Sequence, residues 1–174
     1  ANNKFGKTIK LYDNTLFIGT NENSNAGSVY VYQKVSDSSW VKTERIVSPN
    51  PGASHYFGLS IEIGEKKTLF ISEGDTTYGG VGKVHVYNYS SNNNIWSSSQ
   101  TITNGVSDGL GHSISYYNSI LYIGEPYDSN FTGKLYLYKY NSSTALYEEI
   151  QQLESSNKAE SDLFSSDIVV SKNG

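Results

Sequence analysis

Short runs of alternating polar and apolar residues recur along the whole chain and predict short β-strands. Residues 8–11 alternate with the period of two that one face of a strand requires. Asp13 and Asn14 follow as a two-residue hairpin turn signal, and residues 15–19 form the next apolar run. Residues 20–26 are a polar loop, and strands are expected at 29–32 and 40–47. No segment holds the 3.6-residue period of a helix over about 11 residues, so helices are not expected.

This pattern repeats. An aromatic or leucine residue, followed in the first three copies by glycine, opens each copy at residues 5, 57, 110 and 164, with spacings of 52, 53 and 54 residues. A glycine precedes each third strand and an aromatic residue marks each fourth strand, namely Gly27, Gly82 and Gly133, and Trp40, Trp96 and Tyr147. Repeats of about 50 residues with four strands each are typical of radially arranged sheets.

The recurring third strand carries valines or leucines on one face and mostly tyrosines on the other, so both faces of each sheet need cover. We therefore predict an all-β chain of β-propeller blades, each with four antiparallel strands. Blade 1 spans 1–56, blade 2 spans 57–109, blade 3 spans 110–163, and 164–174 is the first strand of a fourth. Propellers have about 4 to 8 blades. We therefore expect these three blades to be an arc of a propeller with about six or seven blades in all. Further blades of the same chain or of another copy are expected to cover its open faces.

The phased motifs resemble the FG-GAP repeat family, the integrin-α-like propellers. Phe5-Gly6 and Phe57-Gly58 match the family's FG pair, Leu110-Gly111 is a conservative variant, and Gly124-Glu125-Pro126 occupies the Gly-Ala-Pro position. WD40 repeats are shorter, at roughly 40–45 residues. Kelch blades carry a Gly-Gly pair, found here only at Gly79-Gly80.

The resemblance implies a non-enzymatic extracellular or cell-surface module for protein or glycan binding, adhesion or structural assembly. The alternatives are a cation-dependent, lectin-like ligand-binding module and, third, a hydrolase built on the propeller. No P-loop, dinucleotide-binding or Gly-x-Ser-x-Gly motif is present, so an enzyme is not expected.

Composition narrows the function classes further. The 174 residues contain no cysteine, which excludes disulfides and thiolate metal sites, and the formal net charge of −4 gives no basic footprint for nucleic acid. No apolar run approaches the ~20 residues of a membrane-spanning helix, so no membrane insertion is expected in this segment. The chain begins at Ala1 and lacks methionine, so we expect a mature product or a piece of a longer chain.

Calcium is the cation to consider, because integrin-like blades often bind it between their first and second strands. Those connections here are residues 12–14, 64–67 and 117–119, and none supplies the five or more oxygen ligands that calcium needs. We predict no calcium at these turns and no cofactor. Oxygen ligands are more abundant between the second and third strands, where the cation candidates are Glu73, Asp75, Glu125 and Asp128.

The same loops are the predicted partner-binding surface. By the resemblance they share a face with the blade connections at 48–56, 104–109 and 154–162. The candidate contact residues are Asn23, Asp75, Tyr78, Tyr127, Asp128 and Phe131. The competing interpretation is an ordinary solvated loop, in which Asn, Asp and Ser bond their own backbone.

The histidines and the glycosylation sequons are two further residue sets that bear on function. His85 stands where the other copies have Tyr30 and Tyr136, which predicts a strand side chain filling a blade face. His55, His85 and His112 occupy different phases of the repeat, so a repeated zinc site is not expected. The N-glycosylation sequons are Asn88, Asn130 and Asn141, and their use would place the protein in a secretory pathway.

Overall fold

The fold is all-β. The computed structural model describes residues 4–21, 26–52, 55–74, 81–105 and 109–170. In these residues the helical segments are two three-residue 3-10 turns, η1 (Glu65–Lys67) and η2 (Ser129–Phe131), and no helix is long and apolar enough to cross a bilayer.

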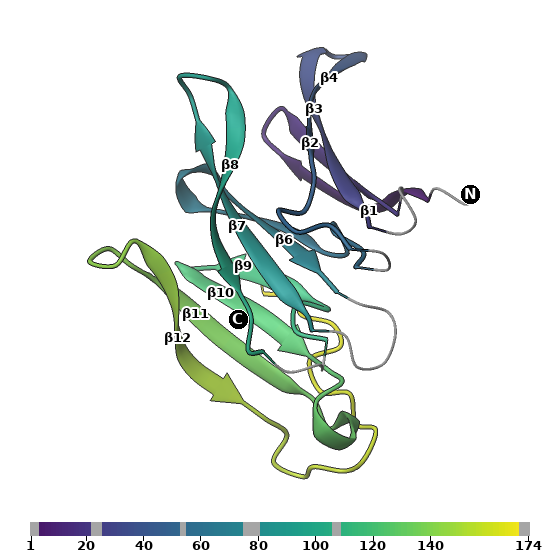
Figure 1. The fold of residues 1–174 in the computed structure, drawn as a ribbon, viewed down its shortest axis with the longest axis vertical. Coiled ribbons are helices and arrows are strands. Elements are labelled where there is room, and N and C mark those ends of the chain that lie inside the picture. The colour runs from purple at the N-terminus through teal and green to yellow at the C-terminus, as the bar shows by residue number, and fades with distance from the viewer. Residues whose placement is uncertain (1–3, 22–25, 53–54, 75–80, 106–108, 171–174) are drawn as a thin grey trace.

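Twelve strands form three antiparallel sheets, which follow one another in chain order from the purple first sheet to the green third (Figure 1). The first sheet contains β1 (Phe5–Tyr12), β2 (Thr15–Thr20), β3 (Ser28–Ser36) and β4 (Ser39–Ile46). The second contains β5 (Ile61–Gly64), β6 (Thr68–Glu73), β7 (Lys83–Ser90) and β8 (Ile95–Ile102). The third contains β9 (Ile114–Tyr117), β10 (Ile120–Glu125), β11 (Lys134–Asn141) and β12 (Leu146–Leu153).

Each sheet is a meander in which every strand pairs with the next, as the repeat predicts. The first hairpin confirms the two-residue turn, because Tyr12 pairs with Thr15 across Asp13 and Asn14. Each sheet also has a bulge between its third and fourth strands at the same repeat position, next to Val31, Val86 and Leu137. The strand β5 contacts both β1 and β9, so neighbouring sheets approach one another closely at their first strands.

Two apolar cores lie between the sheets. In the first, Phe17, Val29 and Val31 from the first sheet pack against Leu69 and Ile71 from the second. In the second core, the other face of the second sheet packs on the third through side chains that include Phe70, Val84, Val86, Leu121 and Ile123. The middle sheet is therefore apolar on both faces because a sheet lies on each side of it.

The FG pair makes the contact that joins one sheet to the next. The backbone N–H of Phe57 donates to the carbonyl of Ala26 at 3.0 Å, and Phe57 forms a parallel bridge with Gly27. A Cβ atom on Gly27 would collide with the Phe57 backbone, and φ at Gly27 is +78°, so glycine is required there. Gly82 faces the Leu110 backbone and Gly133 faces the Phe164 backbone in the same way. We call this contact the Phe–Gly joint.

A second contact recurs towards the fourth strands. The Glu44 carboxylate accepts a hydrogen bond from the backbone N–H of Trp96 at 3.2 Å. At the equivalent position Gln100 accepts from the Tyr147 N–H and donates to the Tyr147 carbonyl, both at 2.8 Å. Between each pair of neighbouring sheets, one side chain of the earlier sheet thus fixes the position of the fourth strand of the next sheet.

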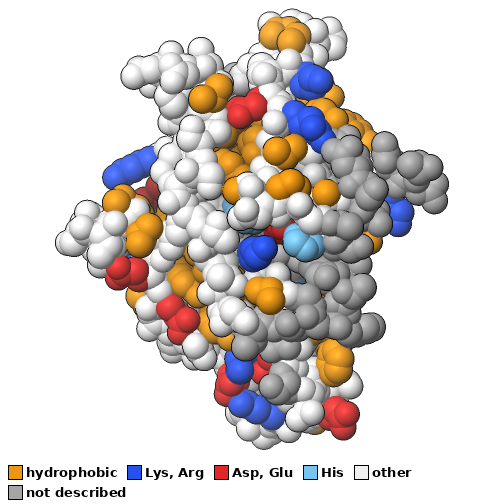
Figure 2. All heavy atoms as spheres, viewed as in Figure 1, with side chains coloured by type: hydrophobic (Ala, Val, Ile, Leu, Met, Phe, Trp, Pro, Cys, Tyr) orange, Lys and Arg blue, Asp and Glu red, His pale blue; other side chains and the backbone are white. Residues whose placement is uncertain are grey.

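The outer faces of the arc differ from the middle sheet. On the first sheet Ile9 and Leu11 are 62% and 59% exposed, and Tyr30 and Tyr32 are half-buried rather than fully covered as the sequence suggested. On the third sheet Leu153 is 38% exposed. Hydrophobic side chains also reach the surface at several separate places in the view of Figure 2. The described residues place no further sheet against these outer faces.

Within residues 164–170, the described part of the expected first strand of a fourth blade, the structure forms no strand. Phe164 occupies the same joint as Phe57 and Leu110, and its N–H donates to the Thr132 carbonyl at 3.2 Å. Residues 164–170 then run on without strand pairing. A first strand pairs with the second strand of its own sheet, and the described residues hold no such partner for this segment.

The Phe–Gly joint predicts unequal effects of two matched substitutions. Phe57 is 1% exposed, whereas Phe5 holds the same repeat position and is 57% exposed. We expect Phe57→Ala to lower the free energy of unfolding by about 3–5 kcal/mol, through lost burial and the cavity left behind. Phe5→Ala should lower it by less than about 1 kcal/mol. Urea unfolding followed by circular dichroism measures both free energies. Equal effects of the two substitutions would contradict the stabilising role assigned to the Phe–Gly joint.

Candidate functional site

Three aromatic side chains meet at the loop from β10 to β11. Two of them, Tyr127 and Phe131, are predicted contact residues, and the third is His112. Tyr127 lies edge-on to His112, with ring centroids 5.1 Å apart, and edge-on to Phe131 at 6.1 Å. His112 lies between β8 and β9, just after Gly111, so the loop meets the segment that leads into the first strand of its own sheet. Tyr127, Phe131 and His112 are each half-buried, and we call them the loop aromatic cluster.

Asp128, in the same loop as Tyr127 and Phe131, is buried and shapes that loop. One carboxylate oxygen accepts from the Gly133 N–H at 2.6 Å and the Thr132 hydroxyl at 2.9 Å, and the other lies 3.2 Å from Lys134 Nζ. Burial raises the pKa of Asp128, but these hydrogen bonds and the lysine charge outweigh it and lower the pKa overall. Asp128 is only 4% exposed, so it stabilises the loop from within rather than presenting a carboxylate to solvent as a contact residue would.

Glu73 and Glu125, both suggested as cation ligands in loops, are instead buried at the ends of β6 and β10. Glu73 is 2% exposed and accepts hydrogen bonds from Ser48 at 2.6 Å, His55 at 2.9 Å and His85 at 2.6 Å. Glu125 is 1% exposed and accepts from Tyr136 at 2.7 Å and from the Asn104 side chain. The structure therefore corrects their placement, because both carboxylates are committed to protein donors.

These donors show what the two glutamates do. Ser48 and His55 lie in the connection between the first and second sheets, and Asn104 lies in the next connection. Each glutamate thus ties the incoming connection to the sheet that it enters. Sequence reasoning missed this role because acidic residues after a strand usually face solvent. The available signal was the repeat phase, which gives Glu73 and Glu125 one repeat position and His85 and Tyr136 another, on the neighbouring strand.

His85 is a buried strand side chain, which confirms its sequence assignment. It is 1% exposed, packs on Phe57 with ring centroids 5.5 Å apart, and bonds both ring nitrogens. Nε2 faces Glu73 and Nδ1 lies 3.1 Å from the Thr101 hydroxyl.

Other predicted site residues are distributed as follows. Asn23, Asp75 and Tyr78 lie outside the described residues. Of the sequons, Asn130 is exposed in η2 and Asn88 is exposed on β7. Asn141 ends β11, and its amide donates to Glu148 at 2.8 Å.

Across the described ranges, no group of three or more His, Asp or Glu side chains is arranged to hold a metal ion. Glu73, Glu125 and Asp128 each have their own protein donors and do not converge. The expected absence of calcium at the turns between first and second strands stays a prediction.

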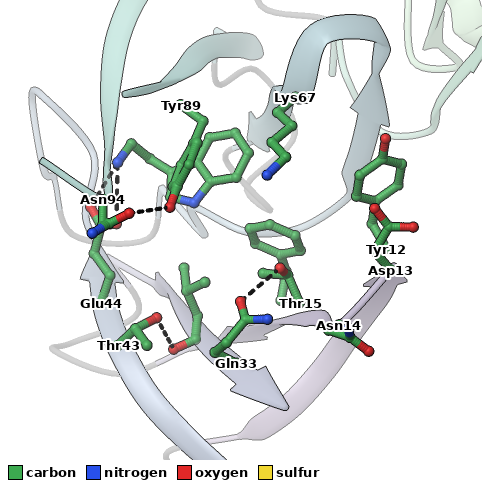
Figure 3. A pocket seen from close by; sticks show the side chains of 13 residues that line it. Tyr12, Asp13, Asn14, Thr15, Gln33, Thr43, Glu44, Lys67, Tyr89 and Asn94 are labelled. Atoms are coloured by element: carbon green, nitrogen blue, oxygen red, sulfur yellow. Dashed lines mark hydrogen bonds between the residues drawn. The ribbon is translucent and has the colours of Figure 1, made fainter. Parts of the chain in front are cut away.

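A cleft that the sequence did not reveal lies between the first and second sheets, at the end opposite the loop aromatic cluster (Figure 3). Its volume is about 560 Å³. The first sheet contributes the Asp13–Asn14 turn, Gln33 and Glu44, and the second contributes Lys67 and side chains from the β7–β8 hairpin. We call it the first inter-sheet cleft. It escaped prediction because its walls come from two repeats.

A related cleft of about 480 Å³ lies between the second and third sheets. Repeat symmetry relates its lining to the first, with Asn88 in the place of Gln33 and Gln100 in the place of Glu44. The aromatic wall changes, because Tyr147 replaces Trp96 and Ala145 replaces Asn94. The two clefts occupy equivalent positions in the repeat, but their side chains differ in chemistry.

Comparison with known proteins supports the fold alone. No protein-family model and no curated protein matches the sequence. Among solved structures, a protein from Lactobacillus plantarum matches with a TM-score of 0.58 at 13% identity, over 81% of this chain. The match covers 39% of that protein, so the chain spans about two fifths of its length. The chain is thus β-propeller-like, with three blade-like antiparallel sheets consistent with an arc of a propeller.

The hydrogen bonds of Glu73 predict a pH-dependent contribution to stability. Burial raises its pKa, but bonds from His85, Ser48 and His55 and the charge of His85 lower it overall. A carboxyl whose folded pKa lies below its unfolded pKa stabilises the fold above the unfolded value, and this contribution disappears as the pH falls through the folded value. We expect the free energy of unfolding of the wild type to fall more steeply than that of Glu73→Gln between about pH 5 and pH 3.

Urea titrations at several pH values measure this difference. Glu160→Gln changes an exposed carboxyl and is the matched control, which should retain the wild-type slope. Parallel curves for wild type and Glu73→Gln would contradict the role assigned to Glu73.

Proposed function

We propose that this chain is a non-enzymatic module of an extracellular or cell-surface β-propeller that binds a protein or glycan partner through the loop aromatic cluster. The observation that supports this most is the pair of half-buried rings of Tyr127 and Phe131 on a loop held by the buried Asp128 carboxylate. The assignment to FG-GAP, integrin-α-like propellers and the extracellular location belong to this proposal. Both rest on the phased FG pairs and on the propeller-like fold.

Rigid, half-buried aromatic residues favour partner binding over simple solvation. Large aromatic side chains contribute most of the energy at many interfaces, and a fixed loop loses little conformational freedom on binding. Asp128 supplies that rigidity, since its carboxylate bonds Thr132, Gly133 and Lys134 within the same loop. The surface presented is therefore largely pre-formed.

The buried carboxylates give less support to the cation-dependent alternative. Glu73, Glu125 and Asp128 would each have to exchange protein donors for a metal ion. A carboxylate–imidazole–hydroxyl series does exist at Glu73, His85 and Thr101. Its imidazole is 1% exposed and packs on Phe57, which favours a structural role for it over a hydrolytic one.

The proposal is tested by binding of the labelled chain to a glycan array and to an array of extracellular proteins. Tyr127→Ala and Phe131→Ala should each weaken any specific signal by about tenfold or more, because truncating a central aromatic residue costs about 1–2 kcal/mol or more. Tyr140→Ala is the control, since Tyr140 is 46% exposed at the opposite end of the third sheet. Specific binding that is insensitive to Tyr127 and Phe131 would place the partner site elsewhere.

A further inference from the structure

We propose that the first inter-sheet cleft is a second binding site, and that its ligand is a neutral saccharide of one or two sugar units. Its volume of about 560 Å³ lies within the range of about 300–1,000 Å³ typical of small-molecule sites. The cleft is separate from the loop aromatic cluster, so this inference stands independently of the partner proposed for that cluster.

Two amide side chains in the cleft have their oxygen atoms fixed by neighbours. Gln33 Oε1 accepts from the Thr15 hydroxyl at 3.1 Å, and Asn94 Oδ1 accepts from the Tyr89 hydroxyl at 2.9 Å (Figure 3). Because the oxygen of each amide is engaged, its NH2 group is oriented to donate to a ligand. The two amides come from different sheets and both line the cleft.

The cleft also has an aromatic wall that is fixed in place. Trp96 lies edge-on to the buried Phe17, with ring centroids 5.4 Å apart, and tilted against Tyr89 at 5.2 Å. Its backbone N–H is held by Glu44. Trp96 and Tyr89 are half-buried, so part of each ring still borders the cleft. Aromatic faces bury apolar C–H groups while leaving polar groups at their edges free to bond.

This combination selects the ligand class. Sugar hydroxyls both donate and accept, which suits side chains that include amides, hydroxyls and the exposed Asp13 carboxylate. The faces of sugar rings carry C–H groups that suit Trp96. An anionic ligand is disfavoured, because Lys67 is the one basic residue lining the cleft, against Asp13 and Glu44, and its Nζ already lies 4.9 Å from the Tyr89 ring centroid.

The two tryptophans make the test specific. Trp40 is the residue of the first sheet that is equivalent to Trp96 of the second. No described sheet precedes the first, so Trp40 does not line an inter-sheet cleft of this kind. In Trp40→Phe, Trp96 is therefore the sole tryptophan and reports on this cleft alone. The probes are the methyl glycosides of glucose, galactose, mannose and N-acetylglucosamine, together with lactose, cellobiose and N,N′-diacetylchitobiose, and inorganic phosphate is the anionic probe.

We expect at least one saccharide to change Trp96 emission saturably, with a Kd of about 1 mM or tighter, while phosphate does not. In the Trp40→Phe background, Gln33→Met keeps the side-chain volume but removes the amide, and Asn94→Ala removes the second amide. Each should raise the Kd by about fivefold to tenfold. Asn88→Leu, which keeps the approximate shape of Asn but removes the amide, makes the corresponding change in the second cleft and should leave the Trp96 titration unaltered.

Thermal melts of each variant separate loss of binding from loss of folding. If Gln33→Met melts early, Asn94→Ala decides the result, because Asn94 is exposed in a hairpin. No saturable change with any sugar would overturn the proposal, as would a change that persists in both amide variants. Binding of phosphate in preference to sugars would also overturn it. None of these results bears on Tyr127 and Phe131, so they leave the proposed partner site standing.

Discussion

The Phe–Gly joint is the contact on which the arrangement of the three sheets depends. At each joint the backbone of one repeat's opening residue lies directly on a glycine that starts the third strand of the preceding repeat. This close approach leaves no room for a side chain at Gly27, Gly82 or Gly133. It fixes the position of the first strand of each sheet relative to its neighbour, and the two apolar cores fill the space that remains.

Polar contacts around this joint determine what the surfaces can do. Glu73 and Glu125 hold the connections between sheets at one end, and Glu44 and Gln100 hold the fourth strands further out. The loop aromatic cluster lies beside the first set of contacts, and the inter-sheet clefts lie beside the second. Both candidate binding surfaces are therefore built on rigid parts of the fold.

The strands and their order could be predicted from the sequence because each repeat carries the same period-two pattern and the same glycines. His85 could be assigned to a blade face because its repeat phase matched Tyr30 and Tyr136. The burial of Glu73 could not be predicted in the same way, since its donors Ser48 and His55 come from another repeat. The first inter-sheet cleft was hidden for a similar reason, because the repeat aligns Gln33 with Asn88 and gives no sign that Asn94 lies across from it.

The nature of the Phe–Gly joint has a consequence for sequence divergence. Its contacts are made mainly by backbone atoms, so they constrain one glycine and one bulky apolar residue per repeat and leave most other positions free to change. A chain built this way can lose recognisable similarity while its sheets keep their places. For such a chain, the spacing of a few glycines specifies the arrangement of the sheets more strictly than the side chains between them.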